Sequence, residues 1–190
     1  MTDIFTTLEH DHRAVLDILA ALEDMTASAA GQPTQMLVDR GGPLTRELIA
    51  AESRHEAAEE QYFWPTVKTK LPDGQRLAAH AVDQESEAKT VLAKLDGMSL
   101  DDERFMPLIQ DFVKAARSHI EFEEQQVWPQ LCPTLSMPER ERLANKFARA
   151  KKMGPTHPHP HTPPNPAVLK TAGIAGAALD RGRDWLSSRR

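Results

Sequence analysis

An eleven-residue segment occurs twice in this chain, and it constrains the fold more than any other feature. Residues 55–65 read His-Glu-Ala-Ala-Glu-Glu-Gln-Tyr-Phe-Trp-Pro, and residues 119–129, 64 positions later, repeat six of these eleven residues. Both copies keep the pattern His-x-x-x-Glu-Glu-Gln-x-x-Trp-Pro. A His and a Glu four residues apart lie about 40° apart around an α-helix and one turn apart along it, so they can bind one metal ion together. The repeat therefore predicts two helices that face each other across a shared site.

The remaining periodicity predicts more helices around these two. Apolar residues recur at helical spacing in four segments, residues 3–25, 44–70, 75–95 and 102–130. Glycine and proline mark a loop at 27–43 and a tight turn at 71–74, and no segment alternates over the length of a strand. Four amphipathic helices joined mostly by short connections predict an all-α, antiparallel up-down-up-down four-helix bundle.

The chain continues beyond the predicted bundle of residues 1–132. We expect a short helix at 133–153, a Pro/His-rich linker at 154–166 and a C-terminal helix at 167–190. The linker holds His157, His159 and His161, which could bind a metal weakly, but a solvated linker is the favoured interpretation. The last helix is expected to pack on the bundle or to mediate a homodimer or another contact.

Composition narrows the function classes. A formal net charge of −5 argues against nucleic-acid binding, which requires a basic face. No apolar run approaches the roughly 20 residues that a transmembrane segment needs, and the N-terminus lacks the pattern of a signal peptide. The single cysteine, Cys132, excludes an internal disulfide and fits a reducing compartment. These features predict a cytoplasmic location.

Each predicted bundle helix carries one histidine on its apolar face, and two of these are followed four residues later by a glutamate. A lone histidine in such a place is more often a core residue than a ligand. Buried carboxylates, however, are costly unless they pair or bind a cation, and four histidines with two carboxylates can satisfy that need with two metal ions. No cysteine lies among them, which argues against a structural zinc site. The predicted ligands are His12, His55, Glu59, His80, His119 and Glu123.

Over residues 3–132 the chain resembles the hemerythrin-like (HHE cation-binding) domain family. The resemblance rests on the order His, His-x-x-x-Glu, His, His-x-x-x-Glu at positions 12, 55/59, 80 and 119/123. It implies an antiparallel four-helix bundle that holds two non-haem iron ions with an oxo or hydroxo bridge. It further implies that one iron is held by His12 and His55 and the other by His80 and His119, with Glu59 and Glu123 bridging.

The chain departs from the oxygen-carrying members of this family. Gln84 stands where they have a fifth histidine, and Glu123, four residues after the last histidine, replaces an aspartate five residues after it. Two histidines per iron leave more open positions than an oxygen carrier has, which favours redox turnover. The chain in this respect resembles the bacterial members linked to peroxide, NO or iron handling.

The leading hypothesis is a di-iron protein that reacts with O2 or H2O2 in oxidative-stress defence, with a peroxide-consuming (catalase- or peroxidase-like) or ferroxidase-like activity. The alternatives are a sensor or store for O2, NO or iron without turnover, and a bundle loaded with Mn or Zn. Among neighbouring residues, Glu56 is a candidate further ligand, and Tyr62 and Gln84 are candidate hydrogen-bonding neighbours of the site. Trp64 and Trp128 are expected to pack the end of the bundle.

Overall fold

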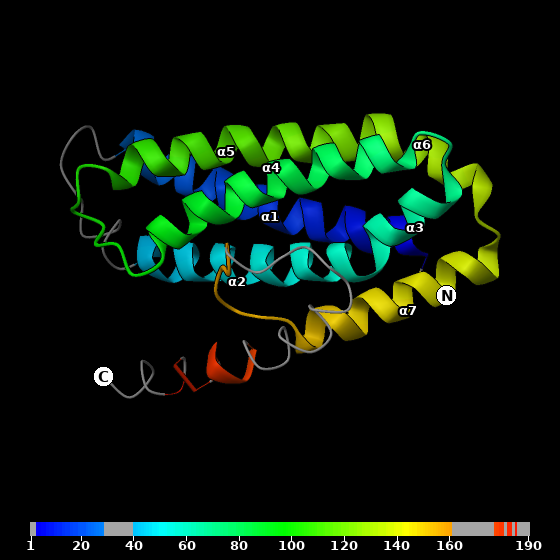
Figure 1. Ribbon diagram of the computed structural model, residues 1–190. Helices are drawn as coiled ribbons and strands as arrows, with labels where there is room; N and C mark the ends of the chain where they lie inside the picture. Colours follow the sequence, from blue (N-terminus) through cyan, green and yellow to red (C-terminus); the bar gives the residue numbers. More distant parts are fainter. Residues whose placement is uncertain (1–2, 29–39, 161–176, 181, 184, 186–190) are drawn as a thin grey trace.

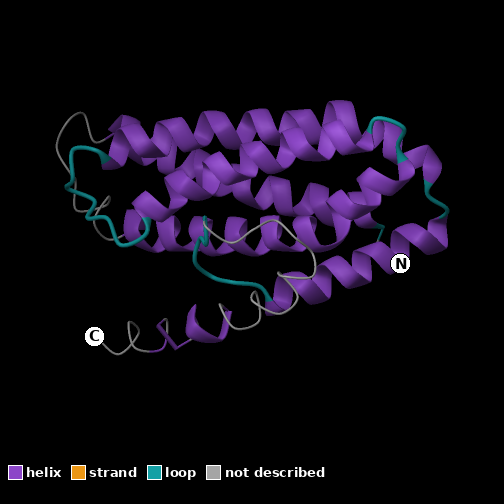
Figure 2. Cartoon of the chain, in the orientation of Figure 1, coloured by secondary structure: helices purple, strands orange, loops and turns teal. Residues whose placement is uncertain are grey.

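The computed structural model describes residues 3–28, 40–160, 177–180, 182–183 and 185, and within these ranges it contains helices and no strand (Figure 2). Four long helical stretches run antiparallel and form the predicted four-helix bundle (Figure 1). They are α1 (Ile4–Ser28), α2 with its continuation α3 (Gly42–Ala58 and Trp64–Lys70), α4 (Gly74–Leu95), and α5 with its continuation α6 (Phe105–Phe122 and Trp128–Leu131). The all-α bundle predicted from the periodicity is confirmed.

Two of the predicted helices contain a π-helical turn. These turns are η2 (Glu59–Phe63) and η3 (Glu123–Val127), and each begins at the first residue of the Glu-Glu pair that both copies share. Pro65 and Pro129 explain them, because proline has no N–H to donate and its ring collides with the carbonyl four residues earlier. The wider turn avoids this conflict: the N–H of the preceding tryptophan donates to the carbonyl of Glu59 or Glu123, five residues earlier. The repeat thus sets the backbone of both copies in the same way.

The core consists of two apolar clusters with a polar layer between them. One cluster lies around α3 and α6 and contains Phe63, Trp64, Phe122 and Phe147; the other, around the opposite half of the bundle, contains Leu19, Leu48, Leu92, Phe105 and Phe112. Along each of the four helices the residues of one cluster give way to buried polar residues and then to the other cluster. Buried polar groups are costly unless they have partners, so this layer needs a function. Its buried members are Asp11, His12, Ser53, His55, Glu56, Glu59, Glu60, Glu85 and Glu123.

A fifth helix, α7 (Met137–Met153), follows the bundle after the 3-10 turn η4 (Cys132–Thr134). It starts with a capping box in which Ser136 and Glu139 bond each other's backbone N–H groups, and it crosses the bundle against α1 and α2 (Figure 1). Its apolar face joins the cluster around α3 and α6. His161, part of the predicted linker and most of the predicted C-terminal helix lie outside the described residues. None of the described helices has the length and apolar character needed to cross a membrane.

Candidate metal centre

Three histidines converge in the polar layer from three different helices. His12 lies on α1, His55 on α2 and His119 on α5; the first two are buried and the third is partly buried. The rings of His12 and His55 have their centroids 5.3 Å apart. Each ring has an acceptor 2.9–3.3 Å from its Nδ1 atom: Glu124 Oε1 for His12, Asp11 Oδ2 for His55 and Gln84 Oε1 for His119. An Nδ1–H that donates outward fixes the tautomer in which Nε2 keeps its lone pair, as in histidines that bind metals.

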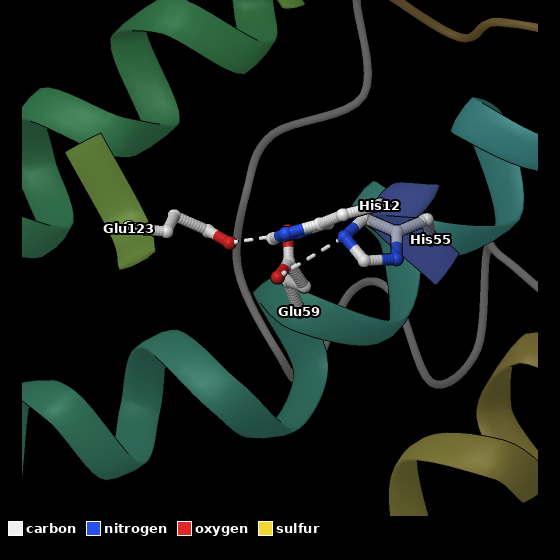
Figure 3. Close-up of side chains that lie close together, drawn as sticks. All are labelled: His12, His55, Glu59 and Glu123. Carbon is white, nitrogen blue, oxygen red and sulfur yellow. Dashed lines mark ion pairs between the residues drawn. The ribbon is translucent and has the colours of Figure 1, made fainter. Parts of the chain in front are cut away.

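The Nε2 atoms face two fully buried carboxylates at the first turn of the π segments. Glu123 reaches toward His12 from across the bundle, with its Oε2 3.1 Å from Nε2 of His12 (Figure 3). Its Oε1 lies 3.5 Å from Nε2 of His119. Glu59 Oε1 lies 3.3 Å from Nε2 of His55. Within the described residues, none of the three Nε2 atoms and none of the four carboxylate oxygens has a hydrogen-bond partner of normal geometry. An unpaired buried polar group costs about 1–3 kcal/mol, so a cluster of seven such atoms fits a bound cation.

The donor atoms form two groups that share a residue. His12, His55, Glu59 and Glu123 each offer one atom within 4.8 Å of the others, and so do Glu59, Glu85 and His119. Glu59 belongs to both groups, while the two oxygens of Glu123 face histidines of different groups. The arrangement could therefore hold two neighbouring metal ions with carboxylates between them, as helical bundles commonly do.

The structure does not bring one of the six predicted ligands, His80, into these groups of donor atoms. His80 is exposed on α4, and its ring packs edge-on against Phe122 with centroids 4.7 Å apart. Glu85, five residues further along, is 1% exposed and points into the site instead. The buried stripe of α4 runs through Ala81, Glu85, Ala88 and Leu92, at helical spacings of four, three and four. A glutamate in a stripe of small apolar residues was the signal in the sequence that would have identified this site residue.

Glu85 sits in a second cluster of charged side chains beside the site. One of its oxygens accepts a short hydrogen bond from Nε1 of Trp64, while the other has no hydrogen-bond partner. The Nζ atom of Lys89 lies 4.0 Å from Glu85 and 3.8 Å from Glu56, and donates a short hydrogen bond to Glu60. Lys89 thus partly compensates three buried carboxylates. Glu56, the candidate further ligand, is buried and also keeps one oxygen without a partner.

Both tryptophans of the repeat contact the site, a contact that the prediction of bundle-end packing missed. Trp64 donates to Glu85, and Trp128 stacks on the ring of His12 with centroids 5.3 Å apart and planes inclined by 19°. Tyr62 is partly buried and packs against the apolar cluster around α3 and α6.

Burial and mutual repulsion alter the protonation of the metal-free site. Burial, followed by the charge of Glu123, raises the pKa of Glu59 to about 7. Burial also raises the pKa of Glu85 well above its usual value. Burial lowers the pKa of His55, but the charge of Glu59 and the hydrogen bond to Asp11 outweigh it and raise that pKa well above normal. Protons therefore occupy part of the donor set at neutral pH, and a metal ion must displace them.

A small cavity adjoins the donor atoms on the side of the second apolar cluster. Its volume is about 20 Å³, which is enough for a water-sized molecule. Its polar wall includes His55, Glu85 and His119, and its apolar wall includes Val15, Phe112 and Ile120. The cavity could admit a molecule as small as O2 or H2O2 next to the donor atoms.

The fold and this cluster define a helical-bundle protein with a buried His/carboxylate cluster that could hold a cation. The chain belongs to the hemerythrin family, since the family model described as the hemerythrin HHE cation-binding domain matches residues 3–131. It is 31% identical over 135 residues to an uncharacterised hemerythrin-like protein of Schizosaccharomyces pombe. That match covers 70% of this chain and 66% of the relative, slightly less than two thirds of the relative's length. No solved structure gives a significant match. The family resemblance predicted from the repeat is confirmed.

Proposed function

We propose that this chain binds two iron ions in the His/carboxylate cluster and consumes hydrogen peroxide, in the reducing environment of the cytoplasm. The observation that carries the proposal is the convergence of unpaired Nε2 and carboxylate atoms beside a cavity of molecular size. The bound irons would supply Lewis acidity and a reservoir of electrons for small oxidants.

The donor set divides unevenly between the two ions. His12 and His55 would serve one ion and His119 and Glu85 the other, with Glu59 and Glu123 shared between them. Glu60 is neutralised by Lys89. The carboxylates of Glu59, Glu85 and Glu123 then carry three negative charges, more than one divalent cation compensates. This excess supports two ions rather than one, because uncompensated charge is costly in a buried site.

The carboxylate content of the site favours oxidation chemistry over reversible O2 binding. Hard, anionic oxygen donors stabilise a more highly charged metal ion better than neutral imidazoles do. Because Glu85 takes the place predicted for His80, the site has three histidines where four were expected. We infer that iron at this site is readily oxidised, which suits a peroxidase-, catalase- or ferroxidase-like reaction.

Reduction of peroxide to water also consumes protons, and the cavity wall can supply them. Oε2 of Glu56 has no hydrogen-bond partner, although Nζ of Lys89 lies 3.8 Å away. Burial raises the pKa of this carboxyl well above its ordinary value, so it can hold a proton at neutral pH. Glu52 lines the same cavity and is partly exposed. Because both residues line the cavity, we propose that they relay protons to it from the surface.

The test is to load the full chain with ferrous iron without oxygen, measure the iron content, and then add H2O2 in excess. Catalase-like turnover converts two peroxide molecules into two waters and one O2 and needs no reductant, so we expect O2 release at half the molar rate of peroxide loss. A ferroxidase would instead consume peroxide only in proportion to the iron supplied. His55→Ala should lose iron and turnover, whereas His10→Ala, at an exposed position on α1, should keep both. Full iron content and full turnover in His55→Ala would refute the proposal.

One observation favours a sensor as the second candidate function. Phe147 of α7, outside the residues that the family model matches, packs on the ring of His55, so occupancy of the site could be transmitted to a separate element. A sensor for O2, NO or iron would form one stable adduct or retain its metal without repeated turnover. The same peroxide experiment separates the two functions, since a sensor gives at most a single-turnover response.

A further inference from the structure

Helix α7 lies outside residues 3–131, to which the family model is confined, yet it reaches the candidate metal centre. The far end of α7 is attached to the bundle by Glu139, which accepts a hydrogen bond from Lys70 at 2.7 Å, and by Arg140, which lies 3.4 Å from Asp3. Neither contact involves a buried residue of the polar layer. The other end of α7 makes contacts of a different kind, around His55.

A chain of two polar contacts connects α7 to His55. Nζ of Lys151 lies 2.5 Å from Oδ1 of Asp11, and the other oxygen of Asp11 lies 3.3 Å from Nδ1 of His55. The side chain of Asp11 is only 10% exposed, so this carboxylate is held between one partner on α7 and one on α2. Lys151 thereby fixes the orientation of the acceptor that sets the tautomer of His55.

An apolar contact restricts the same ring from another direction. Phe147 is fully buried and meets the His55 ring edge-on, with centroids 5.5 Å apart and planes inclined by 77°. Just beyond the helix, Gly154 lies so close to α2 that a Cβ there would stand 3.5 Å from Cα of Arg54. The C-terminal end of α7 therefore packs directly beside the turn of α2 that carries His55.

His55 differs in this respect from the other two histidines of the site. The Nδ1 partner of His12 is Glu124 and that of His119 is Gln84, and both partners belong to the bundle itself. For His55, the partner Asp11 is in turn paired with a residue of α7. The bundle of residues 3–131 supplies Asp11 to this histidine, but Lys151, which holds Asp11, and Phe147, which packs on the ring, both come from α7.

We propose that α7 is part of the metal centre, with Lys151 and Phe147 acting as positioning residues that hold Asp11 and the ring of His55 in place for metal binding. The inference rests on the proposed function, because it needs a metal at His55. Docking of α7 raises the metal affinity of the group that contains His55. By thermodynamic linkage, a metal bound there increases the equilibrium constant for docking of α7 on the bundle by the same factor.

The test is a Co2+ titration of the metal-free full chain, followed by visible absorption and by competition with a chelator. We expect Lys151→Met to weaken one of two Co2+ sites by about 10–100-fold, the usual effect of removing a residue that orients a ligand. Lys152→Met, at an exposed position next to it, is the matched control and should bind like the wild type. Lys151→Arg should restore the affinity. In the Asp11→Asn background, Lys151→Met should cost nothing further, because both changes break the same chain of contacts.

Amide hydrogen exchange of residues 143–153 provides a second readout. Co2+ should slow exchange in α7 of the wild type and much less so in Lys151→Met. Far-UV circular dichroism of each metal-free variant shows whether it is folded, and Lys151, with a side chain 30% exposed, is not a core residue. Wild-type Co2+ affinity in Lys151→Met, or α7 exchange that Co2+ leaves unchanged in the wild type, would overturn the inference while the proposed function stands. A wild-type chain that binds neither Co2+ nor Fe2+ would overturn both.

Discussion

Glu59 is expected to destabilise the metal-free protein, and the size of this effect follows from its surroundings. Its side chain is fully buried, and burial together with the charge of Glu123 raises its pKa from 4.5 to about 7. A carboxyl whose pKa is higher in the folded state stabilises the fold fully below its unfolded pKa. That contribution is lost as the pH rises through the folded pKa. The difference between the two pKa values corresponds to about 3 kcal/mol, lost between about pH 4.5 and pH 7.

Glu59→Gln keeps the shape of the side chain and removes its ionisation. At about pH 5, where the buried carboxyl is protonated, the variant should be within about 1 kcal/mol of the wild type. At about pH 8.5 it should be more stable by about 3 kcal/mol. Urea unfolding of the metal-free proteins at both pH values measures the difference, and Glu87→Gln, at an exposed position on α4, is the control that should show no such change.

Metal should reverse the order of stability. Two bound ions stabilise the wild type by mass action, while Glu59→Gln, having lost a shared donor, gains little. The reasoning about a buried, repelled carboxylate would be refuted if the difference in unfolding free energy between Glu59→Gln and the wild type were the same at both pH values. It would also be refuted if the variant were the less stable protein at the higher pH.

Glu85 gives two further predictions, Glu59 a third and α7 a fourth. Glu85→Ala should lower the metal content from two ions toward one, while His80→Ala leaves it unchanged, as elemental analysis of dialysed protein would reveal. Trp64→Phe removes the indole donor to Glu85 and should weaken the second ion about 10-fold in a Co2+ titration. Metal affinity should fall as the pH drops through about 7, because Glu59 then binds a proton that the metal must displace; calorimetric titrations on either side of that pH measure it. Phe147→Ala should cost about 3–5 kcal/mol in thermal or urea unfolding, because this fully buried ring leaves a cavity under α7.

The bundle was predictable because its helices obey a simple periodicity and its turns carry Gly and Pro. The break at Glu59–Phe63 was not predicted, since residues 44–70 read as one continuous helix. Pro65 was the available signal: a proline inside a helical pattern must kink it, break it or widen a turn. The periodicity alone could not indicate which of these occurs, because that depends on how both halves of the helix pack in the bundle.

For the candidate site, the sequence predicted which side chains meet where they lie on one helix at a fixed spacing, but not which face of a helix points inward. His55 with Glu59 and His119 with Glu123 come together as predicted by the spacing of four. On α4, preference for a histidine selected the exposed face and missed Glu85. The contact of Lys151 with Asp11 joins residues 140 positions apart and follows only from how α7 crosses the bundle, which no local pattern encodes.

The first copy of the repeat contacts two residues of α4. The second residue of its Glu-Glu pair, Glu60, accepts a hydrogen bond from Lys89, and its tryptophan, Trp64, donates its indole N–H to Glu85. Both contacts help to keep a carboxylate buried at this position, Lys89 by its charge and Trp64 by its hydrogen bond. The group of donors that includes Glu85 of α4 therefore contains two carboxylates, Glu59 and Glu85, and one histidine, His119.

The second copy uses the same residue types to contact α1, where they meet a histidine instead of a glutamate. Glu124, which corresponds to Glu60, accepts at Nδ1 of His12, and Trp128 stacks on the His12 ring. These contacts orient an imidazole, so this half of the site is richer in nitrogen donors. Because the repeated segments are alike, the asymmetry of the centre originates in the residue that each facing helix presents, His12 on α1 and Glu85 on α4. Two ions held by such different donors should differ in affinity and in the ease of oxidation, which suits a centre whose two metals have separate tasks.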